Sequence, residues 1–384
     1  MKCILDPRKL LLLTILLYQN SIFAANRYEI DANHHIDYSG YVGYRYLFSD
    51  NEIKSTYIDR GLPEVGLNII YNNNNFQIFN QFRYGEDSGT FLVYNFMQYT
   101  FNVADEFNVS VRGGKLRHDL ALYNTTRVNP KTRQGIVMPQ SIYWDVFNEF
   151  LTSGVGVGMS VQYKDVELSY TIDDPTVLDS KRTARVFYGP MLNDTNTSFG
   201  SHQVASITYS PGNLPLTAKA SWAGINFGDD TGPAMPSISP KSVGKDVTAK
   251  IISFGIEYKL DQWILSGETV WFKTVDKEWS KNLDSISKGY SLTTTYQATE
   301  NIDIRLNYNE FESRLATLFF PKTPWVGYRH DFNVGVNCHT GPWMFQTEAH
   351  YIQGARTMDS VDVSDNVDGF KEWWMVGVQA VYSF

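Results

Sequence analysis

The sequence predicts an all-β protein, a 16-stranded antiparallel transmembrane β-barrel with one long loop folded inward. Apolar and polar residues alternate with a period of two from about residue 36 to the last residue, the pattern of strands with one apolar and one polar face. The connections between these segments alternate between short and long. The only long apolar run lies at the start, which excludes a bundle of spanning helices of about 20 apolar residues each.

Composition narrows the class of protein further. The chain has 384 residues, 33 Lys+Arg against 41 Asp+Glu, and a net charge of −8. Its 9 Trp, 24 Tyr and 23 Phe supply many bulky side chains, which argues against disorder. The acidic balance and a pI of about 5.4 argue against a nucleic-acid partner.

Residues 1–24 are predicted to be a signal peptide, and residues 25–384 a single barrel domain. The first nine residues include three basic ones, Leu10–Tyr18 is apolar except for Thr14, and Ala24 and Ala25 supply small residues for cleavage. The apolar run is too short to span a membrane. Cys338 is then the only cysteine of the mature chain, so no disulfide forms within it.

Sixteen segments have the length that a tilted strand needs to cross a bilayer, mostly nine to thirteen residues. The first contains Ile36 to Phe48 and the last runs from Val376 to Phe384. The others are predicted near 63–71, 75–84, 90–101, 106–116, 153–163, 165–172, 201–209, 216–227, 246–258, 262–275, 287–297, 301–311, 328–339 and 342–353.

The connections predict an up-and-down barrel. Seven are short, at 72–74, 102–105, 164, 210–215, 259–261, 298–300 and 340–341. Eight are longer, at 49–62, 85–89, 117–152, 173–200, 228–245, 276–286, 312–327 and 354–372. An even-stranded barrel with both chain ends on one side produces this count.

The two faces of the strands predict what surrounds the barrel and what fills it. One face carries apolar residues, with aromatic rings at the strand ends, where they prefer a bilayer interface: Tyr44, Tyr46, Phe48, Tyr71, Phe76, Tyr84, Tyr209, Tyr258, Trp263, Tyr296 and Trp343. The other face is polar, as in Glu64, Asn68, Gln77, Gln81, Arg83, Asn108, Arg112, Asp303, Arg305, Asn307, Gln346, Glu348 and His350. A lumen enclosed by sixteen strands is wide enough to hold water.

Segment 90–101 is the exception, because it is apolar on both faces. Phe91, Val93, Met97 and Tyr99 share one face, and Leu92, Tyr94 and Phe96 the other. Two interpretations stay open: the segment packs under an inserted loop, or it faces a neighbouring subunit.

The stretch from Gly113 to Tyr143 resembles a segment of proteobacterial porins, including relatives of the phosphate-selective group. The residues that carry the resemblance are Gly113, Lys115, Leu122, Tyr123, Asn124, Arg127, Pro139, Gln140, Ser141, Ile142 and Tyr143. The chain also ends in Phe384 with an apolar residue at every second position before it. This ending resembles the terminal signal that the barrel assembly machinery of Gram-negative bacteria reads.

The resemblance implies a Gram-negative outer-membrane porin that passes small hydrophilic solutes and ions without a chemical step or a cofactor. Outer-membrane lipid and lipopolysaccharide would surround it, and the family is usually a homotrimer. In such porins the third long loop folds into the barrel and narrows it; here that constriction loop is roughly Arg117–Leu151.

The charge of this region predicts an anion preference. Between Phe107 and Trp144 the only acid is Asp119, whereas six residues are basic: Arg112, Lys115, Arg117, Arg127, Lys131 and Arg133. Arg45 and Arg83 are predicted to face the same lumen. Positive charge at the narrowest point concentrates anions there. The alternative is weak or cation selectivity, with Glu64, Glu167, Glu268 and Glu348 set against the basic residues, or with these paired to other loops or to lipopolysaccharide.

Other functions remain as rivals. A channel specific for phosphate or short sugars is one, although the inward aromatics Tyr41, Phe79 and Tyr94 are too scattered for a sugar ladder. The neighbours His330 and Asp331 suggest a hydrolase, and the long loops an adhesin or phage receptor. Asp359, Asp362, Asp365 and Asp368 recur every third residue, which suggests calcium or an acidic surface loop. We find no Gly-x-Ser-x-Gly, phosphate-loop or Cys/His metal spacing.

Overall fold

The computed structural model describes residues 26–50, 60–85, 89–144, 151–175, 197–229, 247–276, 285–313, 324–356 and 367–384. The predicted signal peptide therefore lies outside the described residues. The strands are β1 Asn26–Glu29, β2 His34–Ser49, β3 Arg60–Asn73, β4 Phe76–Gly85, β5 Gly89–Ala104, β6 Phe107–Arg117, β7 Ser153–Tyr163, β8 Val166–Pro175, β9 Thr197–Tyr209, β10 Leu216–Asp229, β11 Val247–Leu260, β12 Trp263–Asp276, β13 Ser285–Thr299, β14 Ile302–Ser313, β15 Tyr328–Thr340, β16 Trp343–Gln353 and β17 Glu372–Ser383.

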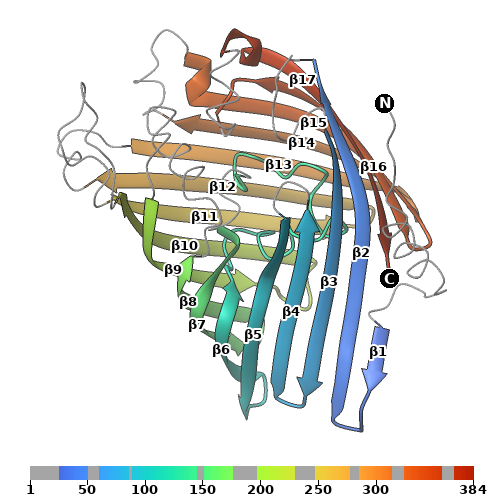
Figure 1. The fold of residues 1–384 in the computed structure, drawn as a ribbon, viewed down its shortest axis with the longest axis vertical. Coiled ribbons are helices and arrows are strands. Elements are labelled where there is room, and N and C mark those ends of the chain that lie inside the picture. The colour runs from blue at the N-terminus through green and yellow to red at the C-terminus, as the bar shows by residue number, and fades with distance from the viewer. Residues whose placement is uncertain are drawn as a thin grey trace.

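The sheet closes on itself as a ring of sixteen antiparallel strands, as predicted (Figure 1). Each strand from β2 to β17 pairs with the next, and β17 returns to β2 over the register Met375↔Ser49 to Ser383↔Tyr41. Closure pairs the backbone N–H and C=O groups that an open sheet leaves at its edges.

The short strand β1 was not predicted, because four residues are too few to show an alternation. It pairs with β2 from Asn26↔Tyr38 to Glu29↔His35. Just beyond this pairing, the backbone N–H of Phe384 donates to the Gly40 carbonyl (3.1 Å), and Gly40 N–H donates to the Phe384 carbonyl (2.9 Å). The two ends of the described chain thus meet on β2.

The fifteen predicted connections are present, and short ones alternate with longer ones except between β4 and β5, where the predicted longer connection is only residues 86–88. Five short turns contain a residue with positive φ: Asn74, Glu106, Lys164, Asp261 and Gly341, at 45° to 61°. A residue with positive φ lets a tight hairpin turn follow the twist of the two strands that it joins. Two 3₁₀ helices, Pro324–Gly327 and Val367–Phe370, lie in the longer connections. In the described ranges, no helix is long and apolar enough to cross a membrane.

The predicted faces are also confirmed. Large apolar side chains are exposed on the outside of every part of the ring, for example Phe48, Val65, Met97, Phe254 and Phe345. Near the short turns, the rings of Trp263 and Tyr296 lie 4.5 Å apart, and those of Trp343 and Tyr382 5.1 Å apart. An apolar outer band with aromatic rings at its ends matches a lipid environment.

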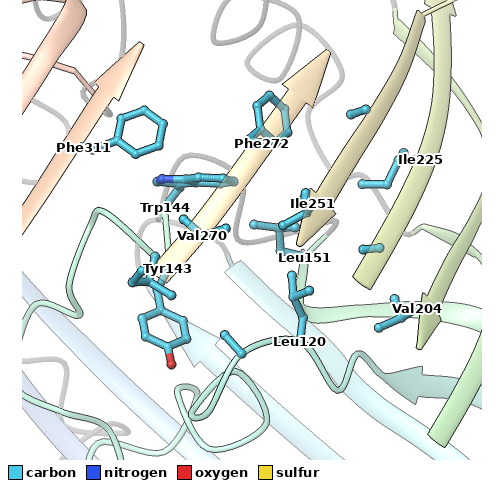
Figure 2. Packing of buried hydrophobic residues seen from close by; sticks show 14 of the residues in the cluster. Leu120, Tyr143, Trp144, Leu151, Val204, Ile225, Ile251, Val270, Phe272 and Phe311 are labelled. Atoms are coloured by element: carbon cyan, nitrogen blue, oxygen red, sulfur yellow. The ribbon is translucent and has the colours of Figure 1, made fainter. Parts of the chain in front are cut away.

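The apolar core lies inside the barrel, between the wall and the loop that connects β6 to β7. Figure 2 shows its largest part, in which Leu120, Tyr143, Trp144 and Leu151 of the loop pack on inward side chains of β9 to β12 and β14. Trp144 contacts Phe272 and Phe311 edge-on, each at 5.3 Å between ring centroids. Part of the inner face that the loop covers is therefore apolar.

The close packing of β2 against the end of the chain at Phe384 can be tested by substitution at Gly40. A Cβ on Gly40 would lie 2.4 Å from the Phe384 ring and 2.9 Å from the Gly66 carbonyl oxygen, whereas one on Gly43 would meet ordinary contacts from 3.4 Å. We expect Gly40→Val to lower the free energy of unfolding by about 1–3 kcal/mol, as overpacking does. Gly43→Ala is the control. Urea titration of the folded barrel measures both, and equal stability of the two variants would contradict the close packing.

Candidate functional site

The loop between β6 and β7, residues 118–152, crosses the lumen, and we call it the internal loop. The structure describes residues 118–144 and 151–152 of it. Its compact turns are closed by its own backbone, for example Thr126 N–H to the Tyr123 carbonyl (3.1 Å) and Tyr143 N–H to the Pro139 carbonyl (2.9 Å). Figure 1 shows it inside the ring of strands.

Carboxylates of β11 and β12 hold the internal loop at Leu122, Tyr123 and Tyr143. Glu268 accepts hydrogen bonds from the Leu122 N–H (2.9 Å) and the Tyr143 hydroxyl (2.7 Å), and Glu257 accepts one from the Tyr123 hydroxyl. Burial, and next the Glu268 carboxylate, raise the pKa of Tyr143 well above its usual value. The hydroxyl therefore stays protonated and donates.

A carboxylate of β16 holds another part of the internal loop. Glu348 is buried and accepts hydrogen bonds from the N–H groups of Ile136 (3.0 Å) and Val137 (2.7 Å). Arg305 and His350 also contact it, at 2.7 Å and 3.0 Å. Ile136 packs in a second apolar cluster, which includes Leu47, Ile352, Phe370 and Trp373. Polar and apolar contacts thus fix the same part of the loop.

Three of the predicted basic residues lie close to one acid, Glu64 of β3, across the ring from β11. Arg45 of β2, Arg83 of β4 and Arg133 of the internal loop lie 3.3, 3.1 and 3.7 Å from the carboxylate of Glu64. Their side chains are only 5–12% exposed. We call these three residues and Glu64 the arginine cluster; with three cations and one anion it carries a formal charge of +2.

The other predicted basic residues lie elsewhere. The Arg127 guanidinium is buried and donates to the Tyr143 carbonyl (2.6 Å) and to Asn124 (3.3 Å), so it stabilises the internal loop. Arg117 stacks over the Tyr94 ring at 4.3 Å. Arg112 is half-buried, as is Lys131 on the loop.

The position of Lys115 differs from the prediction that it lines the lumen. Its cross-strand partners are Asn95 and Val155, and both are exposed outside the barrel. Directly opposed residues of antiparallel strands share a face, so Lys115 lies on the outer face. Its Nζ donates to the Leu92 carbonyl at 2.6 Å.

The inward aromatic residues lie under the internal loop rather than along an open lumen. Tyr41 is 2% exposed and its hydroxyl donates to the Val128 carbonyl at 3.1 Å. Phe79 stacks on Phe96 at 4.6 Å. Tyr94 and Phe96 form a third apolar cluster with Val128. Segment 90–101 is therefore apolar on its inner face because it packs under the loop, the first of the two predicted interpretations.

The four acids that were predicted to offset the basic residues have different surroundings. Glu64, Glu268 and Glu348 are buried in the contacts above, and Glu167 is exposed. Asp119, the only acid of the basic region, pairs with Lys219 and accepts from Ser206. Burial pushes the pKa of Asp119 upward, but Lys219 and Ser206 more than offset this, so the pKa is lowered.

The structure separates the His330–Asp331 pair. Asp331 is buried inside, bonded to Arg329 and His350 at 2.9 Å each. His330 points to the opposite face of β15, because it follows the alternation of the exposed Phe332 and Val334. The two side chains do not form a catalytic pair. Asp359, Asp362 and Asp365 lie outside the described residues, and Asp368 is in the second 3₁₀ helix.

No protein-family model matches the chain, and no curated protein matches it in sequence. Solved structures do match. They include an anion-selective porin from Comamonas acidovorans (TM-score 0.61, 11% identity, 91% of this chain and 100% of that chain). Others are OmpT of Vibrio cholerae (0.60, 11%, 94% and 100%) and the outer membrane channel DcaP of Acinetobacter baumannii (0.56, 13%, 93% and 99%). The chain therefore has the barrel fold of outer-membrane porins.

The bonds at Glu348 predict how firmly the internal loop is held. Glu348→Ala leaves Arg305, His350 and two loop N–H groups without this acceptor, and breaking a buried ion pair costs about 3–5 kcal/mol. We expect a loss of that size in urea unfolding followed by tryptophan fluorescence. Glu167→Ala, at an exposed acid, is the control. A stability of Glu348→Ala equal to that of the control would contradict the anchoring role.

Proposed function

We propose that this protein is a porin of the Gram-negative outer membrane. In this proposal it forms a water-filled channel through which small hydrophilic solutes and ions diffuse passively, with a preference for anions. The arginine cluster, positioned between the internal loop and the wall, is the observation that carries the anion preference. No chemical step and no cofactor are part of this function.

The outer surface supports a membrane location. Its exposed apolar side chains would be poorly solvated in water, and a closed barrel is one of the two folds whose backbone is satisfied in lipid. Outer-membrane lipid and lipopolysaccharide are the partners that this surface fits. The terminal Phe384, paired with Gly40, is proposed as the signal for the barrel assembly machinery.

The charges around the internal loop support the anion preference. β3, which carries Glu64, and β11 are eight strands apart in a ring of sixteen, so they face each other across the lumen. On the β11 side, Glu257 and Glu268 are each covered by a tyrosine hydroxyl of the loop. On the β3 side three guanidinium groups lie within 3.7 Å of the Glu64 carboxylate. Buried charges are weakly screened by salt, so the excess of guanidinium groups over carboxylates among the described residues at this point supports an attraction for anions.

A homotrimer is proposed on the basis of the comparisons alone. One matching structure is described as the trimer form of OmpT of Vibrio cholerae, with a TM-score of 0.58 and 11% identity over 92% of this chain. The apolar inner face of β5 does not contribute to this proposal, because the internal loop covers it.

Charge substitution tests the selectivity. We expect the double variant Arg45→Gln, Arg83→Gln to lower the chloride-to-potassium permeability ratio from above one to near or below one, because the cluster loses both wall cations. The measurement is the reversal potential in a planar bilayer across a potassium chloride gradient. Arg127 is a poor site for this test, because its guanidinium holds the loop together.

The control is Lys164→Gln, at an exposed turn between β7 and β8, which should leave the ratio unchanged. A ratio that is equal in the wild type and in the double variant would remove the arginine cluster from the ion path. A wild-type protein without conductance would contradict the channel itself. Saturable block by micromolar phosphate would narrow the function to a phosphate-specific channel.

The proposed trimer is tested by the mass of the protein in detergent. We expect purified protein in mild detergent to have three times the monomer mass by light scattering and to convert to the monomer on heating. A monomer mass before heating would contradict the trimer and leave the channel proposal intact.

A further inference from the structure

A cluster of three buried side chains near the start of the internal loop takes no part in the proposed channel. His118 begins the loop, Asp173 lies on β8 and His202 on β9, and all three side chains are 0% exposed. His118 Nε2 lies 2.9 Å from Asp173 Oδ2 and 3.3 Å from His202 Nδ1. His202 Nδ1 lies 3.5 Å from Asp173 Oδ1. Two imidazole nitrogens and one carboxylate therefore point at a single small volume.

Hydrogen bonds alone do not satisfy this cluster. If His118 Nε2 and His202 Nδ1 both carry a proton, two N–H groups face each other at 3.3 Å. If His202 Nδ1 carries none, its lone pair faces the Asp173 carboxylate at 3.5 Å. In the described part of the chain, Asp173 Oδ1, which faces the two rings, is buried and has no hydrogen-bond partner. A buried polar atom left unpaired is destabilising. The apposition of two ring nitrogens beside a carboxylate is therefore unfavourable for protons alone.

A metal ion satisfies all three facing groups at once. Zinc binds imidazole nitrogen at about 2.0–2.1 Å in a tetrahedral site, which places neighbouring donor atoms about 3.3 Å apart. The three separations here, 2.9, 3.3 and 3.5 Å, surround that value. Two imidazoles with a carboxylate suit zinc and its first-row neighbours rather than calcium or magnesium. We propose that His118, Asp173 and His202 bind a divalent transition-metal ion of the zinc type.

The surrounding backbone keeps these groups in place. A Cβ on Gly154 of β7 would lie 2.0 Å from Asp173 Oδ1, so the neighbouring strand leaves room for the carboxylate. His118 N–H donates to the Thr152 carbonyl at 3.0 Å, and the Asn124 side chain donates to the His118 carbonyl at 3.1 Å. Such an ion would join the start of the internal loop to β8 and β9. Its three protein donors leave the fourth position of a tetrahedral site to a water molecule.

The test is metal binding to the whole folded barrel in detergent, measured without any conductance. After treatment with a chelator, the protein is titrated with Zn²⁺ by calorimetry. We expect one equivalent bound at micromolar affinity or tighter. We expect His202→Asn and Asp173→Asn to lower the affinity at least tenfold. Co²⁺ in place of Zn²⁺ should give the visible absorption of a four-coordinate site.

Two control variants test whether other histidines bind the Zn²⁺. His330 lies near Glu310 and Glu312 in a second His/acid group on the outer face, and His339 pairs with Asp303 at 3.2 Å. His330→Gln and His339→Gln should keep the tight equivalent. The proposal is overturned if the wild type binds no Zn²⁺ more tightly than His202→Asn does, or if His330→Gln removes the tight equivalent.

Folding is checked by heat-modifiable gel migration. If neither ligand variant folds, the wild-type Co²⁺ spectrum decides. The absence of four-coordinate absorption there overturns the proposal.

Discussion

The width of a sixteen-stranded ring is the constraint on which the rest of this structure depends. Closing the sheet between β17 and β2 satisfies the backbone, but it encloses a lumen that the side chains of the wall do not fill. The internal loop enters that space and must be held there by contacts to several parts of the wall. Three apolar clusters and the carboxylates Glu64, Glu268 and Glu348 supply them.

The same contacts decide what the charges of the loop do. Seen in the sequence, the basic residues between Phe107 and Trp144 form one positive group. In the structure they have separate roles: Arg127 binds the loop itself, Lys115 lies outside, and Arg133 joins two wall arginines at Glu64. The proposed anion preference therefore rests on a small part of the charge that the composition shows, and on two residues, Arg45 and Arg83, that are distant from the loop in the chain.

On the wall opposite the arginine cluster, residues also differ in what they contact. Glu257 and Glu268 receive tyrosine hydroxyls of the loop, which both fixes the loop and covers their charge. The buried His118, Asp173 and His202 join the start of the loop to β8 and β9. Charged residues of the lumen thus either hold the loop or set the local charge, and the partner of each residue decides which.

The strand count, the alternation of turns and loops, and the inward or outward direction of most side chains were determined by the sequence alone. Each depends on a period of two over about ten residues, which local sequence displays. The tertiary structure alone decided which partners meet, because these lie far apart in the chain: Arg133 contacts Gln379 across 246 residues, and His118 contacts His202 across 84. No local pattern encodes such a pair, since only closure of the ring brings its members together. The short strand β1 and the outward Lys115 were missed for related reasons, the first too short for an alternation and the second assigned by its charge rather than by its register.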